Sequence, residues 1–192
     1  MLTYLHVRAI SPRAVRGLLT AGSFSIPCFL GRSGMAHRKR EGDGTTPAGC
    51  FALRRILYRS DRNPMPQSLL PRRPITPADG WCEAPADRNY NRPVKLPYAA
   101  SRESMARGDA LYDIVVILSH NERPRIRGAG SAIFFHLAGS APTAGCIAVS
   151  LKDMRKILAL CGPRTRMAIG PSSAPYGRRK SPNPPAHAWH RS

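Results

Sequence analysis

The stretch HLAGSAPTAGC, residues 136 to 146, contains two side chains that could react together. Cys146 follows a loop of small residues, and His136 lies ten positions earlier, at the end of the apolar segment SAIFF. A thiolate is a strong nucleophile, and a nearby imidazole can take the thiol proton. Gly145 would let a substrate carbonyl approach closely, and backbone N–H groups in such a turn can bind an oxyanion. The pattern indicates acyl-transfer chemistry on a cysteine.

Spacing alone leaves two other interpretations open. A free cysteine is among the most buried residue types, so Cys146 could be a core thiol beside an idle histidine. His120 ends another apolar segment, DIVVILSHN, and is the rival base. Cys161 falls on the apolar side of an expected helix, where it would be a core residue. The remaining three cysteines do not follow a histidine through a loop of small residues; they are Cys28, Cys50 and Cys82.

The reacting side chains must be positioned by strands and a single main helix. The segment 110–121 is β-branched and continuously apolar, which is typical of a strand buried on both faces. Helical periodicity over 150–162, with Ser150 as N-cap, predicts a helix directly after the cysteine. The fold class is therefore mostly β or α+β. Further strands are expected in 1–10, 28–34, 51–56, 131–139, 145–150 and 164–170.

Residues 60–105 are rich in Pro, Arg, Asp and Asn and have little periodicity. A loop of this length within a domain is usually functional, so this insert is expected to act as a lid. Residues 1–170 are expected to form a single catalytic domain. The basic, proline-rich tail 171–192 is expected to be disordered.

Composition limits the possible partners. Lys and Arg number 30 against 11 Asp and Glu, a net charge of +19 that suits an anionic partner. The arginines are scattered and their densest cluster, 178–180, lies in the tail, so no nucleic-acid partner is expected. No paired-cysteine or Cys/His spacing predicts a metal site, and GDG at 42–44 lacks the ending of a phosphate loop, so no cofactor is expected.

The chain contains no apolar run of membrane-spanning length. Its N-terminus lacks the layout of a signal peptide, because arginines interrupt every candidate apolar stretch. The composition leaves the oligomeric state undetermined.

Two motifs together resemble the L,D-transpeptidase catalytic domain, of the YkuD type. One is His136 followed by Thr143-Ala144-Gly145-Cys146-Ile147, and the other is the GDG-x-TP-x-G-x-F segment at 42–51. The resemblance covers roughly residues 25–170 and implies a β-sandwich-like domain with a cysteine nucleophile. Such enzymes attack an L,D peptide bond in peptidoglycan stem peptides and pass the acyl group to an amine.

The resemblance also implies roles for individual residues. Cys146 would be the nucleophile, His136 its base, and the amides of Gly145 and Cys146 would bind the oxyanion. Thr143 would occupy the motif's hydroxyl position, and His120 is a further candidate at the site. The lid would supply substrate contacts, with Arg92 meeting a substrate carboxylate; these contacts are Trp81, Tyr90, Asn91 and Arg92.

Two departures mark a divergent branch. Many relatives have a second histidine where this chain has Ala144, and the spacing of ten from His136 to Cys146 is shorter than in the common pattern. We therefore expect another group, such as His120 or a backbone carbonyl, to orient the base.

Peptidoglycan stem peptides as substrate place the reaction in the periplasm or cell envelope, whereas the missing signal peptide leaves a cytoplasmic location open. Two alternatives to transpeptidation remain. One is an L,D-carboxypeptidase or wall-amide hydrolase on the same fold, and the other is a non-catalytic module that binds cell wall or nucleic acid.

Overall fold

The computed structural model describes residues 1–11 and 13–170, so the predicted disordered tail 171–192 lies outside the described residues. Within this part the chain is mostly β with one helix, α1 (Leu151–Leu158), in agreement with the predicted fold class. The strands are β1 (Tyr4–Ala9), β2 (Arg16–Ala21), β3 (Phe24–Phe29), β4 (Met35–Ala36), β5 (Thr46–Pro47), β6 (Gly49–Tyr58), β7 (Arg72–Pro74), β8 (Asp79–Cys82), β9 (Arg92–Lys95), β10 (Arg102–Ser104), β11 (Ile114–Leu118), β12 (Phe134–Leu137), β13 (Ile147–Val149) and β14 (Arg166–Gly170).

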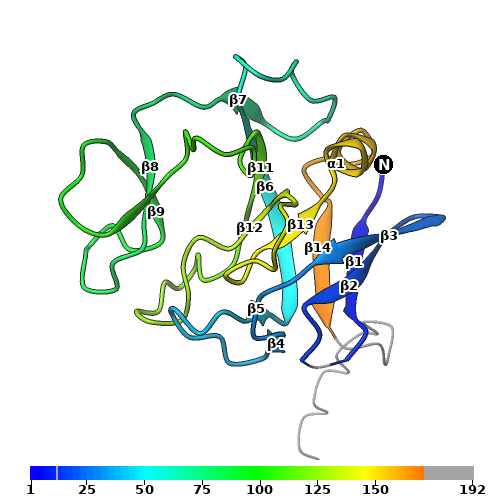
Figure 1. Ribbon diagram of the computed structural model, residues 1–192, viewed down its shortest axis with the longest axis horizontal. Coiled ribbons are helices and arrows are strands. Elements are labelled where there is room, and N and C mark those ends of the chain that lie inside the picture. Colours follow the sequence, from blue (N-terminus) through cyan, green and yellow to red (C-terminus); the bar gives the residue numbers. More distant parts are fainter. Residues whose placement is uncertain (12, 171–192) are drawn as a thin grey trace, which may run out of the picture.

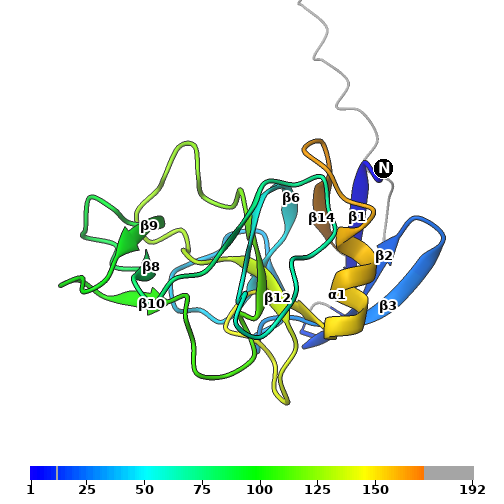
Figure 2. The same ribbon diagram turned by 90° about the horizontal axis from the view of Figure 1, so that it is seen from above.

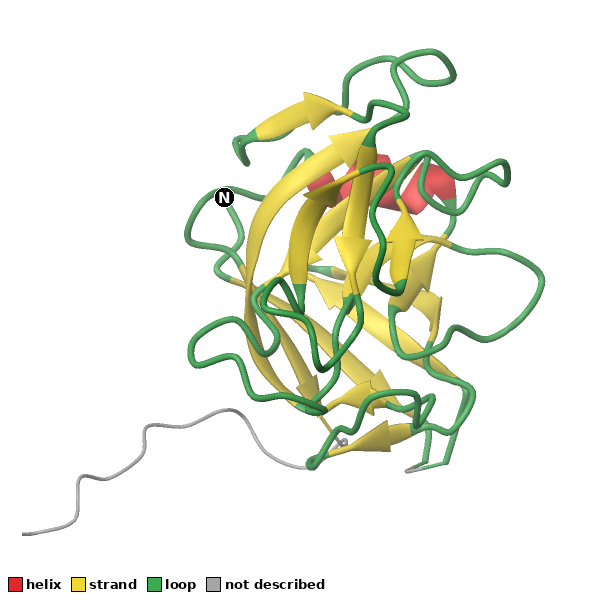
Figure 3. Cartoon of the chain, turned by 90° about the vertical axis from the view of Figure 1, so that its left-hand side faces the viewer, coloured by secondary structure: helices red, strands yellow, loops and turns green. Residues whose placement is uncertain are grey.

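Nine strands form one large sheet in the order β11-β12-β13-β3-β2-β1-β14-β6-β7. The first residues of β6, 49–52, pair with β14, and its later residues, 53–58, pair with β11. Because β11 is the first strand in this order and also pairs with β6 near the other end, the sheet closes on itself and is barrel-like. Figure 3 shows the strong curvature of its strands.

Strands β11 and β12 are buried on both faces, as the continuous apolar pattern of 110–121 predicts. Side chains at Ile114, Val116 and Phe135 pack in the larger core inside the sheet, which also receives the apolar side of α1. Val115 and Phe134 face the other way and belong to a second apolar cluster that contains Cys146. The period-2 alternation of these strands therefore separates the main core from the cluster at the cysteine.

The segment 60–105 is more ordered than the loop expected from its sequence. It contains β7 and a small sheet in the order β10-β8-β9, which lies at the end of the molecule away from α1 (Figures 1 and 2). Trp81 of β8 packs edge-on against Phe134 of β12, with ring centroids 5.2 Å apart. Strands of three or four residues give no recognisable alternation, which explains why the pattern reads as a loop.

Two other elements differ from the predictions. The chain forms a β2–β3 hairpin, in which Ala21 pairs with Phe24 and Gly22 takes a φ of 63°. The expected second strand, 28–34, therefore begins earlier, at Phe24. The helix begins as predicted, since the Asp153 N–H donates to Ser150 Oγ at 3.1 Å, but it ends at Leu158 with Ala159 as C-cap.

Candidate active site

Strand pairing brings His136 and Cys146 to the same side of the sheet. Strands β12 and β13 run parallel, with Phe135 opposite Ile147 and His136 opposite Ala148. Cys146 directly precedes β13 and lies beside Phe134, whose N–H donates to the Cys146 sulfur at 3.3 Å. Phe134 and His136 are two residues apart on one strand, so both face the cysteine side.

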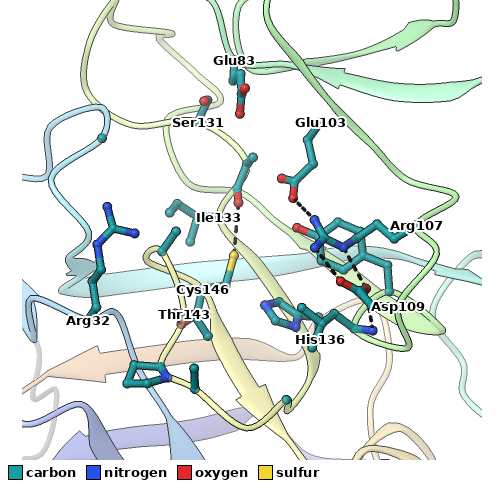
Figure 4. Close-up of a pocket in the computed structure, with 18 of the residues that line it drawn as sticks. Arg32, Glu83, Glu103, Arg107, Asp109, Ser131, Ile133, His136, Thr143 and Cys146 are labelled. Carbon is teal, nitrogen blue, oxygen red and sulfur yellow. Dashed lines mark hydrogen bonds and ion pairs between the residues drawn. The ribbon is translucent and has the colours of Figure 1, made fainter.

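The Cys146 thiol is buried at the floor of a cavity. Its S–H donates to the Ala132 carbonyl at 3.2 Å, the bond drawn as a dashed line from the Cys146 sulfur in Figure 4. Burial raises the pKa of Cys146 to about 12, and this effect outweighs the opposite effect of the Phe134 N–H. The thiol is therefore protonated at neutral pH and needs a base before it can attack.

One hydrogen bond fixes the His136 ring in a single neutral tautomer. Its Nδ1 lies 2.8 Å from the Leu137 carbonyl oxygen, which only accepts, so Nδ1 carries the proton and Nε2 is the unprotonated acceptor. Burial lowers the pKa of His136 to about 4. The Tyr112 ring packs edge-on against the imidazole, with centroids 5.3 Å apart. The orienting group left open by Ala144 is therefore a backbone carbonyl.

The turn before Cys146 depends on Thr143. The Thr143 hydroxyl accepts from the Gly145 N–H at 3.1 Å and donates to the Cys146 carbonyl at 2.7 Å. The Gly145 N–H is therefore used inside the turn in this structure. Among the described residues the Cys146 N–H has no hydrogen-bond partner, so it is a free backbone donor in this turn.

The GDG segment packs close to this turn and holds Lys39 beside it. Lys39 Nζ donates to Asp43 at 2.5 Å and to the Arg40 carbonyl at 3.0 Å, and its side chain is 5% exposed. Burial opposes ionisation of Asp43, but hydrogen bonds from Lys39, Thr45 and Arg40 outweigh it and lower the pKa of Asp43 to about 2. The Lys39 ammonium lies 3.5 Å from the position that a Cβ on Gly145 would occupy. A buried positive charge therefore lies beside the turn that contains Gly145 and Cys146.

The cavity above the thiol has a volume of about 570 Å³ and is lined by Cys146, His136 and Thr143 together with side chains from distant segments. Arg32 lies on one side and Arg107 on the other, where Arg107 bonds to Glu103 at 3.0 Å and to Asp109 at 2.6 Å (Figure 4). Most of this lining could not be predicted from the sequence, because these residues lie far from Cys146 along the chain and form no motif with it. The polar residues concerned are Arg32, Lys39, Glu41, Glu83, Glu103, Arg107, Asp109, Tyr112 and Ser131.

The residues expected to contact substrate from the lid do not line this cavity. Trp81 Nε1 donates to Asn91 Oδ1 at 3.0 Å, and Asn91 Nδ2 donates to the His120 carbonyl at 3.0 Å. Tyr90 is buried, with its hydroxyl donating to Glu41 of the cavity wall, and Arg92 is exposed on β9. Three of these four residues, Trp81, Tyr90 and Asn91, thus brace the wall of the cavity by hydrogen bonds.

His120, the rival base, also lies away from the thiol. Its Nε2 lies 3.0 Å from the Ala129 carbonyl and its ring packs edge-on against Phe51, with centroids 5.4 Å apart. It lines a different pocket from the one that contains Cys146. The structure therefore brings one histidine, His136, to the cavity of the cysteine.

Changing Gly145 to alanine is expected to damage both the site and the fold. Gly145 has a φ of 140°, and an added Cβ would stand 2.8 Å from the Thr45 carbonyl oxygen. We expect a loss of about 1–3 kcal/mol in unfolding free energy and about a hundredfold lower activity because Cys146 is displaced. Thermal unfolding and turnover check this, with Gly170→Ala, whose Cβ would meet nothing within 4 Å, as the matched control.

Within residues 1–11 and 13–170, no group of three His, Cys, Asp or Glu side chains is arranged to hold a metal ion. No helix in this part of the chain is long and apolar enough to span a membrane.

Comparison with known proteins agrees with the geometry of the site. The family model of the YkuD L,D-transpeptidase catalytic domain matches residues 17–169, which is well over half of the chain and contains both the GDG segment and the Thr143–Cys146 turn. No curated protein and no solved structure shows significant similarity. The resemblance seen in the two motifs is confirmed by this match, and the chain belongs to the YkuD family of L,D-transpeptidase catalytic domains.

Proposed function

We propose that this protein is a peptidoglycan L,D-transpeptidase that works through an acyl-enzyme on Cys146. The observation that carries the proposal is the tautomer of His136. Its Nδ1 proton is bonded to the Leu137 carbonyl, which leaves Nε2 as acceptor on the cavity side of β12, where the buried Cys146 thiol lies. A neutral thiol with a neutral base is the arrangement that general-base activation of a nucleophile requires.

In the first step the Cys146 S–H proton passes to His136 Nε2 while sulfur bonds to the carbonyl carbon of the L,D peptide bond. The carbon–nitrogen bond then breaks, and the leaving amine takes the proton from Nε2. In the second step an acceptor amine attacks the thioester and gives its proton to Nε2. The carbon–sulfur bond breaks and sulfur recovers that proton, which restores the thiol.

Two groups would stabilise the oxyanion of both tetrahedral intermediates. The Cys146 N–H is without a partner among the described residues, and the Lys39 ammonium lies beside Gly145 in the cavity wall. A fixed positive charge in a buried site stabilises developing negative charge more than it would in water. Thr143 keeps the turn in place by bonding to the Gly145 N–H and the Cys146 carbonyl.

Stem peptides as substrate place the reaction in the cell envelope. The net charge of +19 supports this, because cell-wall polymers and envelope surfaces are rich in anionic groups.

The test is to incubate the purified protein with disaccharide-tetrapeptides and to read products and protein by mass spectrometry. We expect a cross-linked dimer and a thioester adduct on the peptide that contains Cys146. The other four cysteines serve as internal controls. A tripeptide monomer together with the adduct would mean hydrolysis on the same site. Absence of both product and adduct would contradict the enzyme and favour a binding module.

A further inference from the structure

A second pocket, of about 160 Å³, lies between β6, β8 and the segment after β11. It shares no lining residue with the cavity that contains Cys146. Its charged lining consists of four arginines and one carboxylate, Glu122, and its floor includes apolar side chains such as Leu57 and Ile117. The four arginines are Arg54, Arg55, Arg73 and Arg125.

A β-bulge puts two consecutive arginines on the same side of the sheet. Along the β6–β11 ladder Ile117 pairs with Arg55, but Leu118 pairs with Leu53, so Arg54 is an extra residue in β6. In a regular strand neighbouring side chains point to opposite faces, and a bulge suspends that alternation. Arg54 and Arg55 are accordingly both exposed and both line this pocket.

Strand β7 adds further positive charge beside the bulge. It runs parallel to β6, with Ile56 opposite Arg72 and Leu57 opposite Arg73. A shallow hollow next to the pocket is lined by Arg72 and Arg73 together with the two bulge arginines, and its lining includes no carboxylate. Pairing of the two strands therefore concentrates guanidinium groups at one place on the surface.

The neighbouring carboxylates neutralise part of this charge. Arg54 is paired with Glu122, and Arg73 bonds to Asp79 at 2.7 Å. Arg55 makes no side-chain hydrogen bond or ion pair with any described residue, and Arg125 donates to the Asn91 carbonyl at 3.3 Å and has no carboxylate partner within the described chain. Two exposed guanidinium groups thus line one small pocket, and neither has a carboxylate within hydrogen-bond distance among the described residues.

From this geometry we propose that the pocket binds a phosphate group, held by Arg55 and Arg125 and flanked by Arg54 and Arg73. A phosphate offers several oxygens to separate guanidinium forks and carries more negative charge than a carboxylate. A volume of about 160 Å³ is large enough for a phosphate group. This site is independent of the proposed catalysis. It would hold the protein on a phosphate-bearing surface or polymer, whichever bond the thiol attacks.

The test measures binding of inorganic phosphate by ³¹P NMR titration, and of vesicles containing phosphatidylglycerol by co-sedimentation, at two salt concentrations. The variant is Arg55→Ala/Arg125→Ala. The matched control is Arg8→Ala/Arg166→Ala, which removes the same charge from exposed positions on β1 and β14. We expect the control to bind like the wild type and the pocket variant to bind at least tenfold more weakly.

The two ligands separate the sources of the phosphate. Binding of free phosphate that the pocket variant loses assigns the site to a phosphate group as such. Binding of vesicles alone, lost in the same variant, assigns it to a lipid headgroup. Equal weakening in the pocket and control variants, or no binding of either ligand by the wild type, would overturn the proposal. The thermal midpoint of each variant verifies that it is folded.

Discussion

Replacing Cys146 with alanine is expected to lower acyl transfer by about 10⁴-fold or more, because no acyl-enzyme can form without the sulfur. The side chain is buried at the floor of the cavity and makes hydrogen bonds with the Phe134 N–H and the Ala132 carbonyl. Loss of these contacts affects stability modestly compared with the loss of the reaction. The measurement is the rate of dimer formation from disaccharide-tetrapeptides, together with the mass of the protein after incubation.

Cys50→Ala is the matched control, because Cys50 is a free thiol on β6 that does not line the cavity. This control should retain wild-type rates and the wild-type adduct. Full activity of Cys146→Ala, or loss of activity in Cys50→Ala alone, would show that the nucleophile has been assigned to the wrong thiol.

Replacing His136 with glutamine is expected to reduce kcat/KM by about 10²–10⁴-fold, the usual contribution of general-base catalysis. In the wild type, the profile of kcat/KM against pH should lose activity only at an unusually low pH. The active form is the neutral imidazole, and burial lowers the pKa of His136 to about 4, so activity should persist through pH 5 and fall near pH 4. If the base were a solvent-exposed histidine, activity would instead fall near pH 6.5. A fall at that pH would contradict the buried, carbonyl-bonded imidazole.

The same substitution has a second readout that does not depend on substrate. The pKa of His136 in the folded state lies below its value in the unfolded state. Between pH 6.5 and about 4, His136 is therefore protonated in the unfolded chain but neutral in the folded chain. Stability contributed by this residue is therefore complete above pH 6.5 and falls by about 3 kcal/mol as the pH drops to 4. Urea unfolding across this range should show a shallower decline for His136→Gln than for the wild type.

Several features could be predicted from sequence because they depend on local pattern. The two-sided burial of β11 follows from its unbroken run of β-branched residues, and α1 follows from its periodicity and Ser150. His136 and Cys146 could be paired because a strand end and a glycine turn restrict where their side chains point.

Other features depend on contacts between distant segments. Lys39 lies beside Gly145 while bonded to Asp43 of the GDG loop, and Arg107 reaches the cavity from the segment just after the insert. Trp81 and Asn91, by contrast, were predicted to contact substrate but do not line the cavity. An aromatic and an amide in a polar insert look alike in sequence, whether they contact substrate or brace a wall from behind, and here they bond to each other.

The carbonyl of Leu137 gives this site an evolutionary property. Where a carboxylate side chain orients the base, a single codon change can remove it. Here the acceptor for the His136 Nδ1 proton is main chain, and every amino acid at position 137 supplies it. The alanine at position 144 therefore leaves the His136 tautomer intact. The orientation of the His136 ring thus follows from the path of β12.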